Sequence, residues 1–293
     1  MTYLCQPLAV PRIWGSRRSP SGEAIGETWW LYDGGGYSTP LLDASTGRPA
    51  GTVSSVLESG GLPGLVCPLT VKTLHTAEPL SLQVHPGAFG GGLCKAETWI
   101  FLEVSGGSRV LAGLSPGVTR SMLEEAVRSG KLDGALDSWE VHPGDSMHLP
   151  PGTAHALGPG FEVLEIQSGC DVTYRLSDWG RIGPDGHPRR LDIDEGLRCI
   201  DPEGGRPMVA RDGLPGGLER LAGYSIRAVA DSVFDLPAGG VLFLAGGRAE
   251  ACGRSFAPPC CIMASAAGCT VRVSGLAYAA TAVEERWTAE PGA

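Results

Sequence analysis

Residues 144–155 read GDSMHLPPGTAH, a stretch that combines a turn, a short apolar run and a rigid bend. Gly144 and Asp145 suit a turn, and the Pro-Pro-Gly run at 150–152 makes a bend between two strands. The bend delivers His155 to the start of the next strand. The segment therefore predicts two strands that hold a histidine at a defined point of a β structure.

Residues 80–86, LSLQVHP, have the alternation of an extended chain, in which successive side chains point to opposite faces. Ser81, Gln83 and His85 share one face, and Leu82 and Val84 share the other. Taken alone, the pattern suits an antiparallel strand with a wet outer face. It equally suits a strand whose polar face lines a barrel interior and holds a metal or a substrate.

Apolar runs bounded by Gly or Pro come close together from residue 65 onward, which predicts a mainly β protein built from short strands. One segment, 118–136, has apolar residues at helical spacing and predicts an inserted helix. Ser121 and Glu124 could form its capping box, and Gly130 is a natural stop. A second short helix is predicted over 192–200.

The chain is expected to divide into two domains. Residues 1–200 form the larger one, and residues 201–217, rich in Pro, Gly and charge, are interpreted as a linker. Residues 218–293 contain short apolar runs and no histidine, and predict a smaller all-β C-terminal domain.

Composition limits the classes of partner. Among 293 residues, 23 are basic and 32 acidic, so the formal net charge is −9, which disfavours nucleic acid and anionic membrane as partners. The nine cysteines are scattered with no CxxC pair, which disfavours a structural zinc ribbon or a disulfide framework. No signal peptide or long apolar run is recognisable. A reduced, cytoplasmic protein is expected.

The 144–155 stretch resembles the second signature motif of the cupin superfamily, a jelly-roll barrel whose histidine points into the lumen. The first cupin motif normally offers His-x-His and a later Glu. Here Gln83-Val84-His85 takes that place, with Glu97 further on. Two oxygens and two imidazole nitrogens form a mixed site that a divalent metal such as zinc accepts.

The motifs QVHP, KxE, PPGTAHA and TYRLSDW, in this order, make the resemblance more specific. Over roughly residues 10–200 the chain resembles class I mannose-6-phosphate isomerase in its short bacterial form. The resemblance implies a metal-dependent aldose–ketose isomerase that interconverts mannose 6-phosphate and fructose 6-phosphate. It also implies one Zn²⁺ per chain, with another divalent metal as an open alternative, in a monomer or homodimer.

The resemblance also implies site residues, position by position. The zinc ligands would be Gln83, His85, Glu97 and His155. The catalytic arginine would be Arg175, and the residues lining the sugar-phosphate cleft would be Lys95, Glu165, Lys72 and Ser81. On this interpretation Ser81, Gln83 and His85 face into the barrel.

The chemistry of such a reaction assigns roles to these residues. Moving a proton between adjacent carbons needs a general base and acid, and positive charge beside the developing oxyanion. Arg175 stays protonated at neutral pH, so its expected work is electrostatic. Glu165 is the better proton carrier. Lys95 could hold the phosphate or assist in sugar ring opening, and the sequence does not separate these two roles.

Two departures from the family pattern, and two rival interpretations, stay open. The loop between His85 and Lys95 is short and Gly-rich, and Ala96 stands where the family usually has Thr, so the substrate range is open. The rivals are another metal-dependent cupin enzyme and a non-catalytic, sugar-binding cupin. A non-catalytic cupin should have lost Glu165, Arg175 or the metal ligands, and none of these residues is missing.

Overall fold

The computed structural model describes residues 1–60, 69–87, 94–132, 134–168, 170–183, 185–203, 205–214 and 224–282. The chain is 49% strand and 9% helix, with curled antiparallel sheets, so the prediction of a mainly β protein is confirmed. Among the described residues, no helix is long and apolar enough to cross a membrane.

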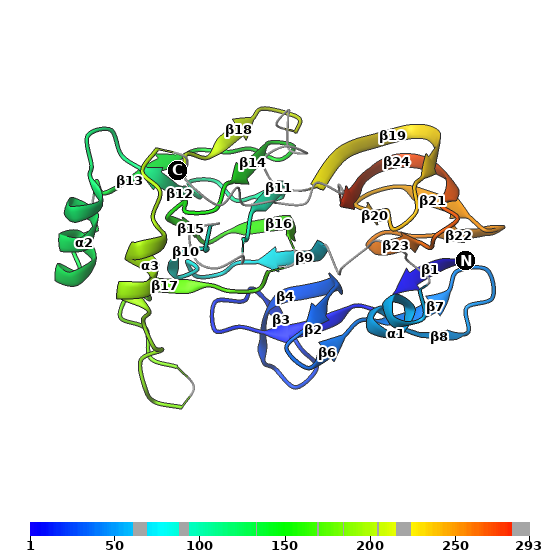
Figure 1. The fold of residues 1–293 in the computed structure, drawn as a ribbon, viewed down its shortest axis with the longest axis horizontal. Coiled ribbons are helices and arrows are strands. Elements are labelled where there is room, and N and C mark those ends of the chain that lie inside the picture. Colours follow the sequence, from blue (N-terminus) through cyan, green and yellow to red (C-terminus); the bar gives the residue numbers. More distant parts are fainter. Residues whose placement is uncertain are drawn as a thin grey trace, which may run out of the picture. The chain divides into compact units, whose positions relative to one another are not determined.

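The helices and strands are numbered in their order along the chain, and Figure 1 labels most of them. The strands of the first half are β1 Thr2–Cys5, β2 Leu8–Pro11, β3 Arg17–Arg18, β4 Ala24–Leu31, β5 Asp33–Gly34, β6 Tyr37–Ser38, β7 Pro40–Asp43, β8 Pro49–Thr52, β9 Leu69–His75, β10 Leu82–Val84, β11 Glu97–Val104, β12 Val110–Leu114, β13 Leu136–Trp139 and β14 Ser146–Leu149. Those of the second half are β15 His155–Leu157, β16 Phe161–Ser168, β17 Tyr174–Ser177, β18 Met208–Ala210, β19 Tyr224–Leu236, β20 Val241–Leu244, β21 Arg248–Ala251, β22 Arg254–Phe256, β23 Cys260–Ala264 and β24 Cys269–Ala282. The helices are α1 Val53–Glu58, α2 Arg120–Ser129 and α3 Ile193–Cys199.

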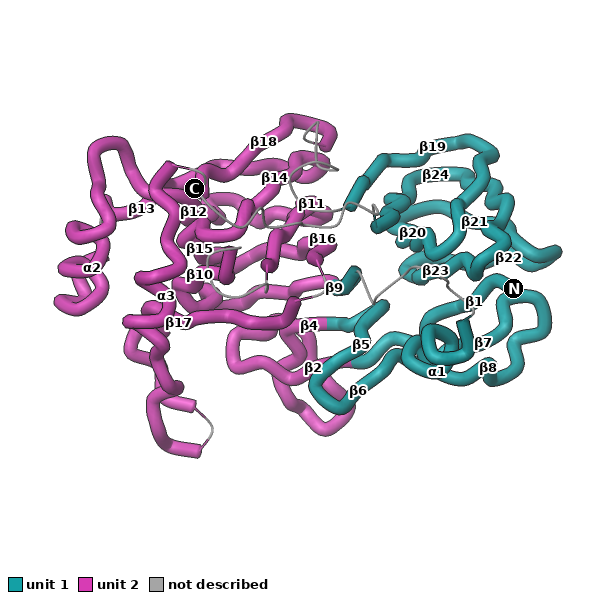
Figure 2. The backbone as a smooth tube through the Cα atoms, in the orientation of Figure 1, with its two compact units in different colours: residues 1–8, 28–72, 216–287 teal, residues 9–27, 73–215, 288–293 magenta. Residues whose placement is uncertain are grey.

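The chain forms two compact units, coloured separately in Figure 2. Unit 1 comprises Met1–Leu8, Thr28–Lys72 and Gly216–Trp287, and unit 2 comprises Ala9–Glu27, Thr73–Pro215 and Thr288–Ala293. This division differs from the expected boundaries at 200 and 218, because β1 pairs with β23 through Thr2↔Ala264. Such a pairing joins segments more than 250 residues apart, and no local pattern signals it.

Unit 1 is built on an antiparallel sheet in the order β22-β21-β24-β20-β23-β1-β7-β8, with β19 paired to β24. The alternate residues of these strands form an apolar core in which Leu242, Leu244 and Ile262 are fully buried. The described residues 224–282 therefore form β structure, as predicted, but their sheet also contains the N-terminal strands β1, β7 and β8.

Unit 2 carries two sheets, one in the order β13-β12-β15-β10-β17 and one in the order β18-β14-β11-β16-β9-β4-β2. Strand β18 pairs with β14 through Met147↔Val209. The expected linker 201–217 therefore contains a strand of this sheet; residues 204 and 215–217 lie outside the described residues.

The inserted helix exists but is shorter than predicted. Helix α2 ends at Gly130, which adopts the left-handed conformation (φ +70°) that favours glycine, as the sequence indicated. The predicted capping box of Ser121 and Glu124 is wrong, because Thr119 is the N-cap and its side chain accepts a hydrogen bond from the Met122 backbone N–H at 3.3 Å. Helix α3 matches the helix predicted over 192–200.

The β10 strand separates two environments in unit 2. Leu82 and Val84 lie on its outer face in an apolar cluster with Leu123 of α2 and Leu197 of α3. The opposite face carries Gln83 toward the other sheet. The helices thus cover the apolar face and leave the polar face for the barrel interior.

Candidate active site

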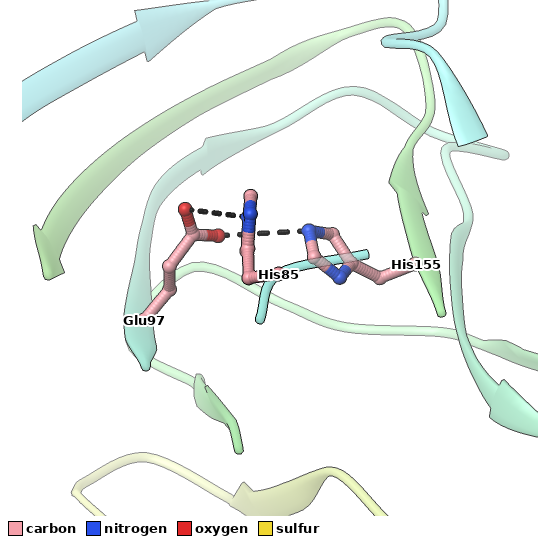
Figure 3. Close-up of side chains that lie close together, drawn as sticks. All are labelled: His85, Glu97 and His155. Atoms are coloured by element: carbon pink, nitrogen blue, oxygen red, sulfur yellow. Dashed lines mark ion pairs between the residues drawn. The ribbon is translucent and has the colours of Figure 1, made fainter. Parts of the chain in front are cut away.

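Three buried side chains in unit 2 converge, as Figure 3 shows: His85, Glu97 and His155. Glu97 Oε1 lies 3.0 Å from His85 Nε2, and Glu97 Oε2 lies 3.6 Å from His155 Nε2. Each of the three residues is at most 2% exposed. The three groups can all reach one point between them.

Strand pairing and the Pro-Pro-Gly bend bring the histidines together. Gln83 of β10 pairs directly with His155 of β15, and the Gly152 backbone N–H donates to the His85 carbonyl at 3.0 Å. Gly152 has φ +82°, and a Cβ there would lie 2.7 Å from the Cβ of Asp201. Only glycine therefore suits this bend, which ties the two motifs to each other.

A backbone carbonyl orients each histidine. His85 Nδ1 lies 3.0 Å from the Val172 carbonyl oxygen, and His155 Nδ1 lies 2.9 Å from the Thr153 carbonyl oxygen. A carbonyl only accepts, so each Nδ1 carries the hydrogen and each Nε2 presents its lone pair toward Glu97. Histidines that bind metals are commonly oriented in this way. Sequence reasoning missed these partners, because distant backbone oxygens leave no residue-type signal.

The electrostatics favour the ligand forms of all three groups. Burial lowers the pKa of His155 to about 3, and nearby His85 adds to the effect. Burial also lowers the pKa of His85, although Glu97 opposes the shift. Burial alone would raise the pKa of Glu97, but His85 and Lys95 outweigh it and hold that pKa well below its usual range. Neutral imidazoles beside a carboxylate are the forms that bind a divalent cation.

Gln83 lies at the edge of this group. Its Nε2 is 3.2 Å from His155 Nε2, and its Oε1 accepts from the Ser81 hydroxyl at 3.4 Å. Rotating the amide by 180° exchanges the two atoms and brings the oxygen to the histidine side. The amide is therefore within reach of the position where the other three donors meet.

The donor set fits a metal ion. Neither His85 Nε2 nor Glu97 Oε2 has a hydrogen-bond partner among the described residues, although both atoms are buried. Buried polar atoms normally have a partner, and a cation between them would supply it. The group could hold a metal ion, which agrees with the sequence prediction at this coarser level.

The other predicted cleft residues are placed differently. Lys95 is 2% exposed, and its Nζ lies 2.9 Å from Glu97 Oε1. Ser81 is buried beside Gln83. Lys72 lies in β9, half-buried, and belongs to unit 1, so its role stays a prediction.

Glu165 lies on β16 opposite Trp99 of β11 and is 2% exposed. Its Oε2 accepts a hydrogen bond from the Trp99 indole Nε1–H at 2.9 Å. The Trp99 ring also packs edge-on against the ring of His155, with centroids 5.4 Å apart. Sequence reasoning missed Trp99. Trp99 and Glu97 are two residues apart on one strand and so share a face, which could have indicated that Trp99 belongs to the site.

Arg175 lies on β17 and pairs directly with Gln83 of β10. Its Nη1–H donates to the Arg190 carbonyl at 2.9 Å, and burial together with nearby Arg189 lowers the pKa of its guanidinium. Asp178, three positions further along the chain, forms ion pairs with Arg181 and Arg189. Arg175 Nε has no hydrogen-bond partner among the described residues.

The fold and the buried His–Glu–His group define a cupin-type β protein with a candidate metal centre. No protein-family model matches the chain. The chain is 32% identical over 214 residues to the probable mannose-6-phosphate isomerase GmuF of Bacillus subtilis, and the aligned region covers 67% of each protein. It is also 33% identical over 148 residues to mannose-6-phosphate isomerase ManA of the same organism, covering 48% of this chain and 47% of ManA.

Solved structures agree on the fold. The crystal structure of the mannose 6-phosphate isomerase from Bacillus subtilis superposes with a TM-score of 0.77 at 21% identity, covering 96% of this chain and 99% of that one. A mutant of phosphomannose isomerase from Salmonella typhimurium superposes with a TM-score of 0.72 at 14% identity, covering 96% and 99%. The chain belongs to the mannose-6-phosphate isomerase family.

Proposed function

We propose that this protein is a metal-dependent aldose–ketose isomerase that interconverts mannose 6-phosphate and fructose 6-phosphate. The observation that carries the proposal is the buried His85–Glu97–His155 group in a chain of this family. A sugar phosphate is the partner that the family and the two buried or half-buried cations, Lys95 and Arg175, together favour.

The metal proposed for the site is zinc, one ion per chain. His85 Nε2, His155 Nε2, a Glu97 oxygen and the Gln83 amide oxygen would hold it, a mixed nitrogen and oxygen set that zinc accepts. When bound, such an ion polarises and orients sugar oxygens as a Lewis acid. Lys95, so close to Glu97, limits the net negative charge of the ligand set.

Glu165 is proposed as the proton carrier between the two carbons. Its carboxylate is buried, and Trp99 holds one oxygen, so it is fixed in direction before substrate arrives. Arg175 is proposed to stabilise the enediolate with its guanidinium, whose Nε–H has no partner among the described residues. Lys95 and Ser81 complete the polar lining, and the substrate-binding role expected of Lys72 stays a prediction.

A coupled isomerase assay on mannose 6-phosphate, with metal analysis of the same sample, tests the proposal. We expect turnover, about one zinc per chain, and loss of activity on chelation that zinc restores. His155→Ala should lose metal and activity together. His142→Ala is the matched control, because the side chain of His142 is 68% exposed and lies outside the group.

Two results would contradict the proposal. Metal-loaded protein that binds the sugar phosphate without turning it over would favour the non-catalytic, sugar-binding cupin. Stoichiometric metal retained in His155→Ala would remove the proposed ligand set. The cytoplasmic location and the monomer or homodimer expected from the sequence remain predictions.

A further inference from the structure

A buried amide next to the candidate metal centre has an unused acceptor. Gln167 of β16 is 0% exposed and pairs directly with Glu97 of β11. Side chains directly opposite each other on antiparallel strands project from the same face, with Cβ atoms roughly 4.5–5.5 Å apart. Glu165, two residues earlier on β16, shares this face. Gln167 therefore lies on the inner face that carries Glu97 and Glu165.

The orientation of this amide is fixed by its donor. Gln167 Nε2 donates to the Cys170 carbonyl oxygen at 3.2 Å. Because a carbonyl only accepts, the amide cannot be turned around without losing this bond. Its Oε1 is then left buried without a hydrogen-bond partner among the described residues.

Leaving a buried acceptor without a partner destabilises the folded protein, and such groups in native proteins usually have a reason. An amide oxygen accepts hydrogen bonds only, so a phosphate or carboxylate ligand would gain nothing from it. The hydroxyl groups of a hexose are donors, and they are the groups that a sugar substrate offers in greatest number.

We propose that Gln167 is a substrate-binding residue whose Oε1 accepts a hydrogen bond from a hydroxyl group of the sugar phosphate. This inference rests on the proposed function. A strand rises about 3.3 Å per residue, so Glu165 and Gln167 stand about 7 Å apart along β16. The two side chains therefore meet different parts of the sugar, so the hydroxyl lies outside the two carbons that exchange the proton at Glu165, and C3 and C4 are the first carbons to test.

A thermodynamic cycle that removes the Gln167 acceptor from the protein and single hydroxyl groups from the substrate tests this inference. Gln167→Met keeps the length of the side chain but removes the acceptor, and it is assayed on mannose 6-phosphate and on its 3-deoxy and 4-deoxy analogues. We expect kcat/KM on mannose 6-phosphate to fall about 10–100-fold, the cost of leaving a hydrogen-bonding pair incomplete. The wild type should disfavour one deoxy analogue by a similar factor, and Gln167→Met should treat that analogue and the full substrate nearly alike.

The analogues separate hydroxyl recognition from general disturbance. The substitution also removes the bond to Cys170, and a loosened loop would lower kcat/KM on all three substrates by the same factor, which would overturn the inference. Unchanged kcat/KM in Gln167→Met would overturn it too. Loss of metal in Gln167→Met, as expected for the proposed ligand variant Gln83→Met, would make Gln167 part of the metal centre instead.

A failure of the proposed function has a different signature. If the wild type does not turn over mannose 6-phosphate, the same cycle is measured as equilibrium binding of the three compounds to the zinc-loaded protein by calorimetry. Discrimination by the wild type that Gln167→Met loses would still support the inference. Binding that does not depend on Gln167, or no binding of any of the three compounds, would contradict it.

Discussion

Two glutamates on β16 differ in the face on which they lie. Glu165 is 2% exposed and accepts a hydrogen bond from the Trp99 indole, whereas the Glu162 side chain is 26% exposed and lies 2.9 Å from Arg17 and 3.5 Å from His75. Alternation along the strand therefore places a candidate proton carrier and a partly exposed carboxylate on opposite faces, three positions apart.

Glu165→Gln keeps the shape and the hydrogen bonding of the side chain but removes the base. We expect kcat to fall about 10²–10⁴-fold with KM little changed, because a proton-transfer group acts mainly in the transition state. Steady-state kinetics with metal analysis measure this. Glu162→Gln is the control and should have kcat within a few-fold of the wild type. Near-normal turnover in Glu165→Gln would remove this residue from the chemistry.

Paired elements, rather than single residues, hold the site in place. Strands β11 and β16 bring Trp99 and Glu165 into register, and the indole N–H is the bond that joins them. A hydrogen bond to a charged group contributes roughly 1.5–3 kcal/mol. Trp99→Phe should therefore lower kcat by about 10–100-fold while KM and metal content stay near those of the wild type.

Trp139→Phe is the matched control for this prediction. The Trp139 indole donates to the Ala112 carbonyl at the same distance, 2.9 Å, in the other sheet of unit 2. Trp139→Phe should lose some thermal stability and keep the kcat of the wild type. Equal loss of kcat in both variants would mean that the indole bond at Trp99 supports folding only.

Helix α3 packs closely on β17, the strand that carries Arg175. A Cβ on Gly196 would lie 2.6 Å from Leu176 Cδ2 and 3.3 Å from Tyr174 Cβ, and Leu176 is 1% exposed. Alanine normally stabilises a helix relative to glycine by about 1 kcal/mol. Here we expect Gly196→Ala to destabilise by roughly 1–3 kcal/mol, because the packed leucine has little room to move.

Urea unfolding of Gly196→Ala measures this effect. Glu195→Ala, next in sequence on α3 with a side chain that is 45% exposed, is the control and should change the free energy of unfolding by no more than about 0.5 kcal/mol. A gain in stability in Gly196→Ala would show that α3 moves freely away from β17.

The stability of the whole molecule depends on pH through buried carboxylates. Burial alone would raise the pKa of Asp178, but hydrogen bonds from Arg189 and Arg181 outweigh it and lower that pKa. Arg181 Nη2–H donates to Asp178 Oδ1 at 2.6 Å, and Arg189 Nε–H donates to Asp178 Oδ2 at 2.7 Å. A depressed folded-state pKa adds stability above the unfolded-state value, about 3.9, and this stability is lost as pH falls through the folded-state pKa.

Asp178→Asn should therefore lower the melting temperature at pH 7, by the equivalent of roughly 1–3 kcal/mol. The difference from the wild type should narrow below about pH 4, where the wild-type carboxylate also becomes protonated. Melting curves between pH 3 and 7 measure both trends. Glu140→Gln, whose side chain is 62% exposed and pairs with Arg109, should follow the wild-type curve throughout. A difference that grows on acidification would contradict the assignment.

Local chemistry explains which features could be predicted from the sequence. The alternation at 80–86 and the Pro-Pro-Gly bend at 150–152 depend on neighbouring residues alone, and they place Gln83 and His155 on paired strands. Helix α2 ends at Gly130 for a local reason as well, because glycine readily adopts the positive φ of +70° that ends the helix there. Its start was misjudged because Thr119 and Ser121 are both good N-caps.

Tertiary structure decided what depends on distant partners. The pairing of β1 with β23, the strand β18 in the expected linker, and the carbonyls of Val172 and Thr153 behind the two histidines are all contacts between separate segments. Backbone atoms are the same in every residue type, so such contacts leave no mark in the sequence. The sequence by itself thus determined the residue types of the site and the strands that carry them. Only the folded chain determined which atom of Glu165 binds the Trp99 indole, and which atom of Gln167 is bonded and which is left for a ligand.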